Sequence, residues 1–213
     1  MTQPLLAIVA QGNDDEILND YRQHQLQPLI DYLVHKLSTG QMASILFVCT
    51  HNSRRSQFSQ TWAQLSANHF NLAIQCFSGG TEVTACNPRT IDSLNRSGLD
   101  IDCKASGDDN PHYLVSCRDS TDPIELYSKR LDDPKNPVEH FAAVMTCDHA
   151  DQNCPTILGA DRRIPIRYED PKAFDDSPQE AVMYDTRSRQ IATEMHYIMQ
   201  KTTEALSQGE RQD

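Results

Sequence analysis

The sequence predicts an α/β fold in which a parallel central sheet is flanked by helices, with an N-terminal helical extension and an inserted excursion. Apolar, strand-like runs alternate with amphipathic helical segments along most of the chain, as in a parallel sheet. One of these runs, Ile45–Val48, is unbroken, which is typical of a strand buried on both faces. The 213 residues allow one domain with an extension.

Residues 12 to 39 have the spacing of helices and precede the first predicted strand. Apolar side chains recur there at three- and four-residue steps: Leu18, Tyr21, Leu29, Ile30, Leu33 and Leu37. Pro28 suits a helix start better than a helix interior, and Gly40 closes the segment. We therefore expect residues 12 to 39 to form a helical hairpin within an N-terminal helical extension, residues 1–43, that packs before the main domain and carries no chemistry.

Residues 44–213 are predicted to form the main α/β domain. Polar residues 50 to 56 follow the first strand, and Phe58, Trp62 and Leu65 then mark one face of a helix. Further strands are predicted at residues 72 to 77, 141 to 145 and 164 to 166.

Capping signals predict where two further helices begin. Asn87 and Pro88 have the residue types of an N-cap and a first helical position, and Gly98 stands where that helix should end. Ser177 and Glu180 have the spacing of a capping box, which opens a long C-terminal helix. The inner side of that helix is apolar: Ile191, Met195, Ile198 and Met199.

Residues 103 to 140 interrupt the alternation of strands and helices. They are rich in Asp, Pro and Ser, and they contain two possible strands, at residues 112 to 117 and 124 to 131. We therefore interpret them as an excursion inserted into the α/β domain.

Charge and composition exclude several function classes. Nineteen basic and 30 acidic residues give a net charge of −11, so the chain is not expected to bind nucleic acid. No apolar run approaches the ~20 residues of a membrane span, and Pro4–Ala10 lacks the positive charge of a signal peptide. No membrane association is therefore expected. The odd number of cysteines, seven, favours reduced thiols in a cytoplasmic protein over a disulfide scaffold.

The segment from Cys49 to Ser56 carries the chemistry, because it places a cysteine, five residues, an arginine and a serine between a buried strand and a helix. N–H groups of the loop and of the helix start form a cradle that favours an anion. The same field stabilises a thiolate, so Cys49 is predicted to be a nucleophile at neutral pH. The predicted oxyanion-binding residues are Thr50, His51, Asn52, Ser53, Arg54, Arg55 and Ser56.

Side chains of this loop have distinct expected roles. Arg55, six positions after Cys49, can bind two oxygens of a tetrahedral oxyanion. Ser56 can donate a hydrogen bond to the Cys49 sulfur, and Asn52 can hold the loop through bonds to the backbone. Arg54 is expected to face solvent, with no role for its side chain.

The loop resembles that of the low-molecular-weight protein tyrosine phosphatases and the thioredoxin-coupled arsenate reductases, which share a fold. Ser78-Gly79-Gly80-Thr81, Asn87-Pro88 and Glu169-Asp170-Pro171 are also similar to that superfamily. The resemblance covers roughly residues 44 to 102 and 141 to 200, and it implies the same fold for them.

The resemblance also implies further catalytic residues. It makes Asp170 the general acid, since a carboxyl group near the loop can give its proton to a departing oxygen. The segment Val144–Pro155 closely resembles the arsenate reductase segment that bears two further redox cysteines, here Cys147 and Cys154. Cys147 also follows a predicted strand, whose end lies at the same sheet edge as Cys49.

The implied reaction is the reduction of arsenate to arsenite. Cys49 attacks arsenate, Cys147 then attacks Cys49, Cys154 attacks Cys147, and a thioredoxin-type partner reduces the resulting disulfide. A flexible segment between Cys147 and Cys154 would let the second sulfur move. No cofactor is expected, and no metal either, because four closely set ligands with zinc-site spacing are missing.

Two other functions stay open at this point. A phosphatase could use the same loop to hydrolyse phosphotyrosine or a small phosphoester through a phospho-cysteine, because arsenate and phosphate share shape and charge. Phosphotyrosine phosphatases carry aromatic residues after the Asp-Pro pair, where this chain has Lys172, with only Phe174 near. A non-catalytic oxyanion-binding module is the third possibility, although a binder needs no acid such as Asp170. Most of the remaining thiols are expected to be packed in the core: Cys76, Cys86, Cys103 and Cys117.

Overall fold

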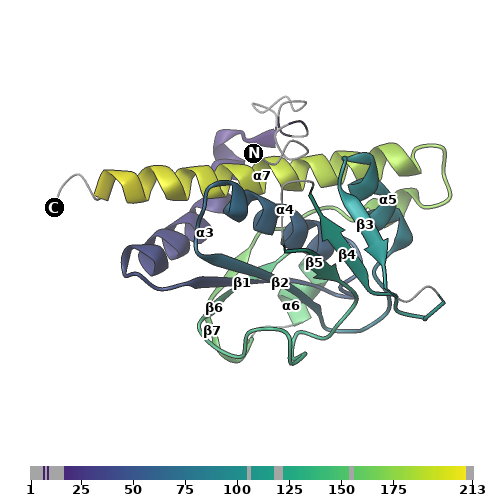
Figure 1. The fold of residues 1–213 in the computed structure, drawn as a ribbon, viewed down its shortest axis with the longest axis horizontal. Coiled ribbons are helices and arrows are strands. Elements are labelled where there is room, and N and C mark those ends of the chain that lie inside the picture. The colour runs from purple at the N-terminus through teal and green to yellow at the C-terminus, as the bar shows by residue number, and fades with distance from the viewer. Residues whose placement is uncertain are drawn as a thin grey trace.

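The computed structural model describes residues 7, 9, 17–104, 107–117, 122–153 and 156–209 (Figure 1). The elements in chain order are α3 (Asp20–Ser38), β1 (Ala43–Cys49), α4 (Arg55–His69), β2 (Ile74–Gly80), α5 (Pro88–Arg96), β3 (Asp100–Cys103), β4 (Tyr113–Ser116), β5 (Ile124–Leu126), β6 (Phe141–Met145), α6 (Asp148–Asn153), β7 (Ala160–Pro165), the 3-10 helix η1 (Pro171–Phe174) and α7 (Glu180–Gly209). None of the helices within these ranges is both long and apolar enough to cross a lipid bilayer.

The larger sheet consists of four parallel strands in the order β2-β1-β6-β7, which confirms the predicted α/β fold. β1 and β6 are neighbours, and Val48 pairs with Met145 near their carboxyl ends. Ligands of open α/β sheets bind at this edge. A separate antiparallel sheet is formed by β3, β4 and β5.

Each face of the larger sheet is covered by its own apolar cluster, because successive strand side chains point to opposite faces. Ile45 belongs to the larger cluster, together with residues of α3, α4, α5 and α7. Leu46 belongs to the smaller cluster, together with residues around α6. Figure 1 shows α3, α4 and α7 on one side of the sheet and α6 on the other. The smaller cluster also contains Cys49 and Cys147.

Helix α3 runs through Pro28, so the prediction that a helix begins at this proline was wrong. The helix begins after Asn19, whose side chain accepts a hydrogen bond from the backbone N–H of Arg22 at 3.0 Å. Its buried residues are Leu26, Leu29, Ile30, Tyr32 and Leu33. Their packing, much of it against α7, outweighs the backbone bond that the proline removes. Residues 12 to 16, in the first part of the predicted hairpin, lie outside the described residues.

The other helix boundaries follow the predicted capping signals. The Asn87 side chain accepts from the backbone N–H of Arg89 at 2.9 Å, which makes Asn87 the N-cap of α5. Gly98 follows that helix with a φ of +90°, a conformation that glycine adopts without strain. α7 begins at Glu180, three residues after the predicted N-cap Ser177, and the Glu180 carboxylate accepts from the backbone N–H of Asp176 at 2.6 Å, so the predicted capping box is shifted by one residue.

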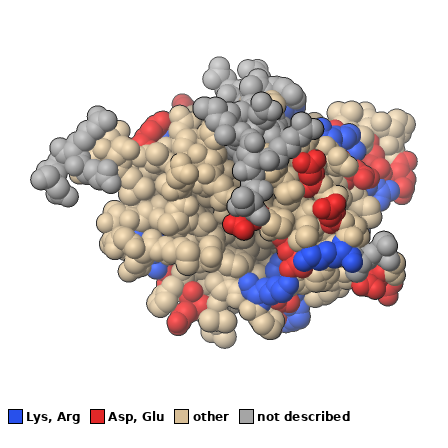
Figure 2. All heavy atoms as spheres, in the orientation of Figure 1, with Lys and Arg blue, Asp and Glu red and all other residues tan. Residues whose placement is uncertain are grey.

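The excursion at residues 103 to 140 forms β4 and β5 within its two predicted strand segments. It then returns to the large sheet beside Gly80, whose N–H donates to the Lys129 carbonyl at 2.9 Å. Figure 2 shows acidic and basic side chains interspersed over the half of this face that carries α5 and the small sheet. Ion pairs there include Arg96 with Asp185 and Arg130 with Asp132.

Candidate active site

The loop between β1 and α4 is held by bonds to its carbonyl groups. Each carbonyl from residue 50 to 53 accepts a hydrogen bond: Thr50 from Glu82 N–H, His51 from Ser128 Oγ, Asn52 from Gln57 Nε2 and Ser53 from Asn87 N–H. These partners direct the carbonyl groups away from the centre of the loop. The arrangement is that of a cradle whose N–H groups and helix N-terminus favour an anion.

Gly80, at the end of β2, allows the backbone of the loop to approach β2 closely, because glycine has no Cβ atom. A Cβ atom at this position would lie 2.7 Å from the Thr50 carbonyl oxygen and 2.8 Å from the Asn52 nitrogen. Both contacts are with loop backbone and cannot be relieved by a side-chain rotation. Asn52 itself has a φ of +46°, the left-handed conformation that Asn tolerates better than most residues.

We therefore expect Gly80→Ala to distort the cradle and to weaken phosphate binding by about tenfold or more, since a loop shift of a few tenths of an ångström disturbs several N–H groups together. Isothermal titration with phosphate measures the effect. Gly209→Ala is the matched control, because a Cβ atom at Gly209 would meet nothing within 4 Å. Equal phosphate affinity in the two variants would contradict the proposed position of the cradle.

Cys49 lies at the floor of the cradle at the end of a chain of polar contacts. Its Sγ is 3.1 Å from Ser56 Oγ, which accepts from Asn52 Nδ2 at 2.8 Å. Asn52 Oδ1 accepts from the backbone N–H of Lys129 at 3.0 Å, and this N–H can only donate, so the orientation of the amide is fixed. Ser56 thus has its own proton free to point at the sulfur, the contact that was predicted for this hydroxyl.

Arg54 and Arg55 both bind Asp170. Arg54 is buried and makes two bonds to this carboxylate, from Nε at 2.7 Å and from Nη2 at 3.2 Å. The prediction that Arg54 faces solvent was therefore wrong, because η1 folds the Asp170 loop over it. Arg55 donates from Nη2 to Asp170 at 2.8 Å and from Nη1 to the Tyr168 carbonyl at 3.0 Å. No local sequence signal separates Arg54 from an exposed arginine.

These contacts set the ionisation of Asp170. Burial acts to raise the pKa of Asp170, but the bond from Arg54 and the charge of Arg55 outweigh it and hold the pKa below its ordinary value. The carboxylate is therefore ionised while both arginines hold it. A general acid must be protonated, so the ionised carboxylate seen here is not in the form that donates a proton.

Cys147 lies at the end of β6 and is almost completely buried. Its Sγ is 3.6 Å from the hydroxyl of Thr50, the residue that follows Cys49, and it accepts from the Ala150 N–H at 3.4 Å. The Thr50 hydroxyl is also 3.2 Å from His149 Nδ1. The structure thus brings the two thiols to one edge of the sheet.

The segment that follows Cys147 is helical and not the flexible stretch that was predicted. It forms α6, and Asp151 of this helix is paired with Arg163 and Arg167 from β7 and the turn after it. These ion pairs hold the short helix against the sheet. Cys154 lies outside the described residues.

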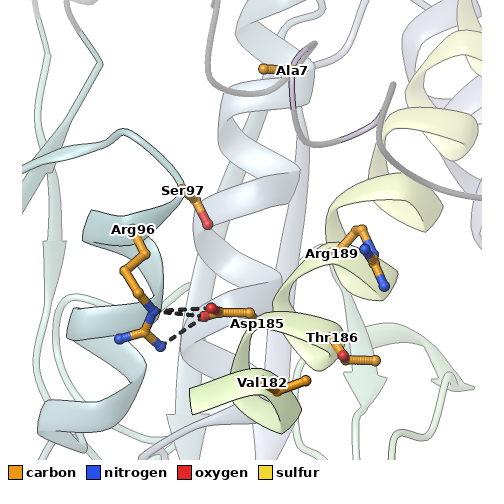
Figure 3. A pocket seen from close by; sticks show the side chains of 7 residues that line it. All are labelled: Ala7, Arg96, Ser97, Val182, Asp185, Thr186 and Arg189. Atoms are coloured by element: carbon orange, nitrogen blue, oxygen red, sulfur yellow. Dashed lines mark hydrogen bonds and ion pairs between the residues drawn. The ribbon is translucent and has the colours of Figure 1, made fainter.

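A cavity of about 320 Å³ opens beside the loop. The polar and charged side chains in its lining are those of His51, Ser53, Arg54, Thr84, Asn87, Lys172 and Asp175. A second cavity of about 320 Å³ lies between α5 and α7, where Arg96 is bonded to Asp185 (Figure 3). The first cavity is lined by His51, Ser53 and Arg54 of the loop, whereas none of the described residues that line the second cavity belongs to the loop.

Other thiols are packed as predicted. Cys76, Cys86 and Cys117 are buried, whereas Cys103 is exposed. Burial raises the pKa of Cys86 to about 12, which keeps this thiol protonated although it lies near the loop. Within the described part of the chain, no group of three or more His, Cys, Asp or Glu side chains is placed to hold a metal ion.

Comparison with known proteins identifies the family. The chain is 30% identical over 115 residues to an arsenate reductase of Staphylococcus aureus, and the match covers 54% of this chain and 67% of the relative. The chain belongs to the arsenate reductase family. An arsenate reductase of Brevibacillus brevis is 28% identical over 128 residues, which cover 60% of this chain and 76% of that protein. These matches confirm the resemblance inferred from the loop.

Family models and solved structures provide two further comparisons for this member of the arsenate reductase family. No family model matches the chain. A solved arsenate reductase in a phosphate-binding state has a TM-score of 0.49 and 17% identity, covering 75% of this chain and 98% of that one. A low-molecular-weight protein tyrosine phosphatase from T. tengcongensis has a TM-score of 0.49 and 15% identity, covering 76% and 98%.

Proposed function

We propose that this chain reduces arsenate to arsenite through Cys49, Cys147 and Cys154, with a thioredoxin-type dithiol as the electron donor. One observation carries the proposal: Cys147 is a second buried thiol in the same apolar cluster as Cys49, and it contacts Thr50 of the loop. Hydrolysis of a phosphoester needs only one thiol, whereas the reduction of arsenate takes two electrons from two thiols.

The contacts of Arg54 and Arg55 with Asp170 support a general acid that becomes protonated only when substrate binds. Arsenate binds to the loop N–H groups and to Arg55, which then turns from Asp170 to the oxyanion. The loss of this contact and the negative charge of arsenate both raise the pKa of Asp170, so its carboxyl group takes up a proton. As the Cys49 sulfur bonds to arsenic, one arsenic–oxygen bond breaks, and Asp170 protonates the departing oxygen, which leaves as water.

The two electrons come from the thiols. The Cys147 thiolate attacks the Cys49 sulfur, the sulfur–arsenic bond breaks, and its electron pair stays on arsenic, which leaves as arsenite. Cys154 then attacks Cys147, so the disulfide moves to this pair and Cys49 is released as a thiolate. The external dithiol reduces the disulfide by exchange. Helix α6 lies between the two cysteines along the chain, and its six residues are too few to be stable alone.

Other parts of the proposal concern organisation and setting. The cavity beside the loop has the cationic side chain of Lys172 in its lining, which favours a small oxyanion over the aromatic ring of phosphotyrosine. Residues 44–213 form the catalytic domain, with the insert at about 103–140, and residues 1–43 form the extension. The relay requires reduced thiols, which suits the cytoplasm.

Two activities measured on one preparation test the proposal. We expect arsenate-dependent oxidation of reduced thioredoxin, with one thioredoxin disulfide formed per arsenite released, and slower hydrolysis of an aryl phosphate. Hydrolysis without arsenate-dependent oxidation of the dithiol would contradict the reductase function. It would favour instead the phosphatase that uses the same loop.

A further inference from the structure

The N-terminal helix α3 reaches the catalytic arginine through a buried polar network. Arg22 of α3 binds Glu194 of α7 at two points, from Nε at 2.8 Å and from Nη2 at 2.7 Å. The Glu194 side chain is completely buried, and 12% of the Arg22 side chain is exposed. A buried carboxylate in such a pair is costly unless its other bonds are also made.

Tyr168 completes the network on the side of the catalytic loop. Its hydroxyl donates to Glu194 Oε2 at 2.7 Å, and the Arg22 guanidinium lies 5.0 Å from the centre of its ring. Burial raises the pKa of Tyr168, and the charge of Glu194 adds to this effect, so the hydroxyl stays protonated and donates. Gln190 supplies a further bond to Glu194 at 3.0 Å.

The same tyrosine touches the reaction machinery through its backbone. The Tyr168 carbonyl accepts the bond from Arg55 Nη1, and Asp170 follows two residues later. We propose that Arg22, Glu194 and Tyr168 form a positioning network through which α3 holds Arg55 in place for oxyanion binding. This inference rests on the proposed function, and it gives the extension a role beyond that of the packing arm expected from the sequence.

Contacts elsewhere on α3 provide matched controls. Lys36 is paired with Asp161 at 2.8 Å, and the Tyr32 hydroxyl is 3.3 Å from the same carboxylate. Asp161 lies near the start of β7, at the sheet edge opposite the loop. Lys36→Met and Tyr32→Phe therefore loosen α3 by the same chemistry without affecting the contact between Tyr168 and Arg55.

Phosphate affinity, measured by titration well below the unfolding temperature of each variant, tests the network. Arg22→Gln and Tyr168→Phe should each raise the phosphate Kd about fivefold, whereas both control variants should stay within about twofold of the wild type. The phosphate Kd of the double variant should lie within about twofold of the Kd of the weaker-binding single variant, because both changes act through one route. Tyr168→Phe preserves the ring and decides the question where Arg22→Gln does not fold.

Each result has a defined meaning. Unchanged phosphate Kd with a lowered Tm in Arg22→Gln and Tyr168→Phe would overturn the network and reduce it to a structural contact. Multiplying effects in the double variant would overturn the single route. A wild-type protein that binds no phosphate would overturn the proposed function and the network together. If the wild type binds phosphate and the variants bind it equally well, only the network is overturned, so binding by the wild type tells the two failures apart.

Discussion

Cys147→Ser stops the catalytic turnover of arsenate, by a factor on the order of a thousand or more, as when a group that makes a reacting bond is removed. Without this sulfur, the proposed relay has no thiol to attack Cys49 and release arsenite. Hydrolysis of an aryl phosphate should persist in the variant, because water can resolve a phospho-cysteine. Cys49→Ser should abolish both activities, since both begin with that nucleophile.

Cys154→Ser separates the two halves of the relay. It should allow one turnover and then stall with a disulfide between Cys49 and Cys147, visible by mass spectrometry of non-reduced peptides. Cys103→Ser is the matched control, because Cys103 is an exposed thiol on β3, outside the relay. Multiple turnovers in Cys147→Ser or Cys154→Ser with thioredoxin as sole reductant would show that the electrons take another route.

Arg55→Lys should weaken phosphate binding by about 2 kcal/mol, or roughly 30-fold, because lysine cannot reproduce a planar two-point grip. Arg54→Lys should change the affinity much less, since the Arg54 side chain is occupied by Asp170. The measurement is phosphate titration of the two variants beside the wild type. Equal losses at the two positions would mean that Arg54 also binds the oxyanion.

Arg54→Lys should instead change the pH dependence of the reaction. The bond from Arg54 is part of what holds the pKa of Asp170 below its ordinary value, so its loss raises that pKa. A general acid works when protonated, and activity falls as the pH rises through its pKa. The alkaline limb of kcat, which reports the enzyme–substrate complex in which Asp170 carries its proton, should therefore move to higher pH in this variant. An unmoved limb would contradict the acid role of Asp170.

The sequence was most informative where structure is local. The loop and the strands around it could be predicted because an apolar run, a polar turn and an amphipathic helix follow one another directly. The prediction at Pro28 was wrong, because the rule that proline breaks helices considers only the backbone hydrogen bond that proline removes. It does not count the packing of the neighbouring side chains against α7.

Long-range contacts were beyond the reach of these patterns. The burial of Arg54 depends on Asp170, 116 positions away. The bond that fixes Asn52 comes from a backbone N–H, that of Lys129, 77 positions away. A backbone donor has no residue type that a sequence could reveal. The contact of Arg22 with Glu194 likewise joins positions 172 residues apart.

Because β1 and β6 are neighbours in the sheet, residues that are far apart along the chain lie close together in space. Thr50 and Cys147 are 97 positions apart, yet neighbouring strands hold them at a spacing of roughly 4.8 Å between backbones. Extra residues in the excursion between them add little to the free energy of closing that loop. The excursion can therefore change in length without changing the contact between Thr50 and Cys147, provided that Lys129 keeps its bonds to Gly80 and Asn52.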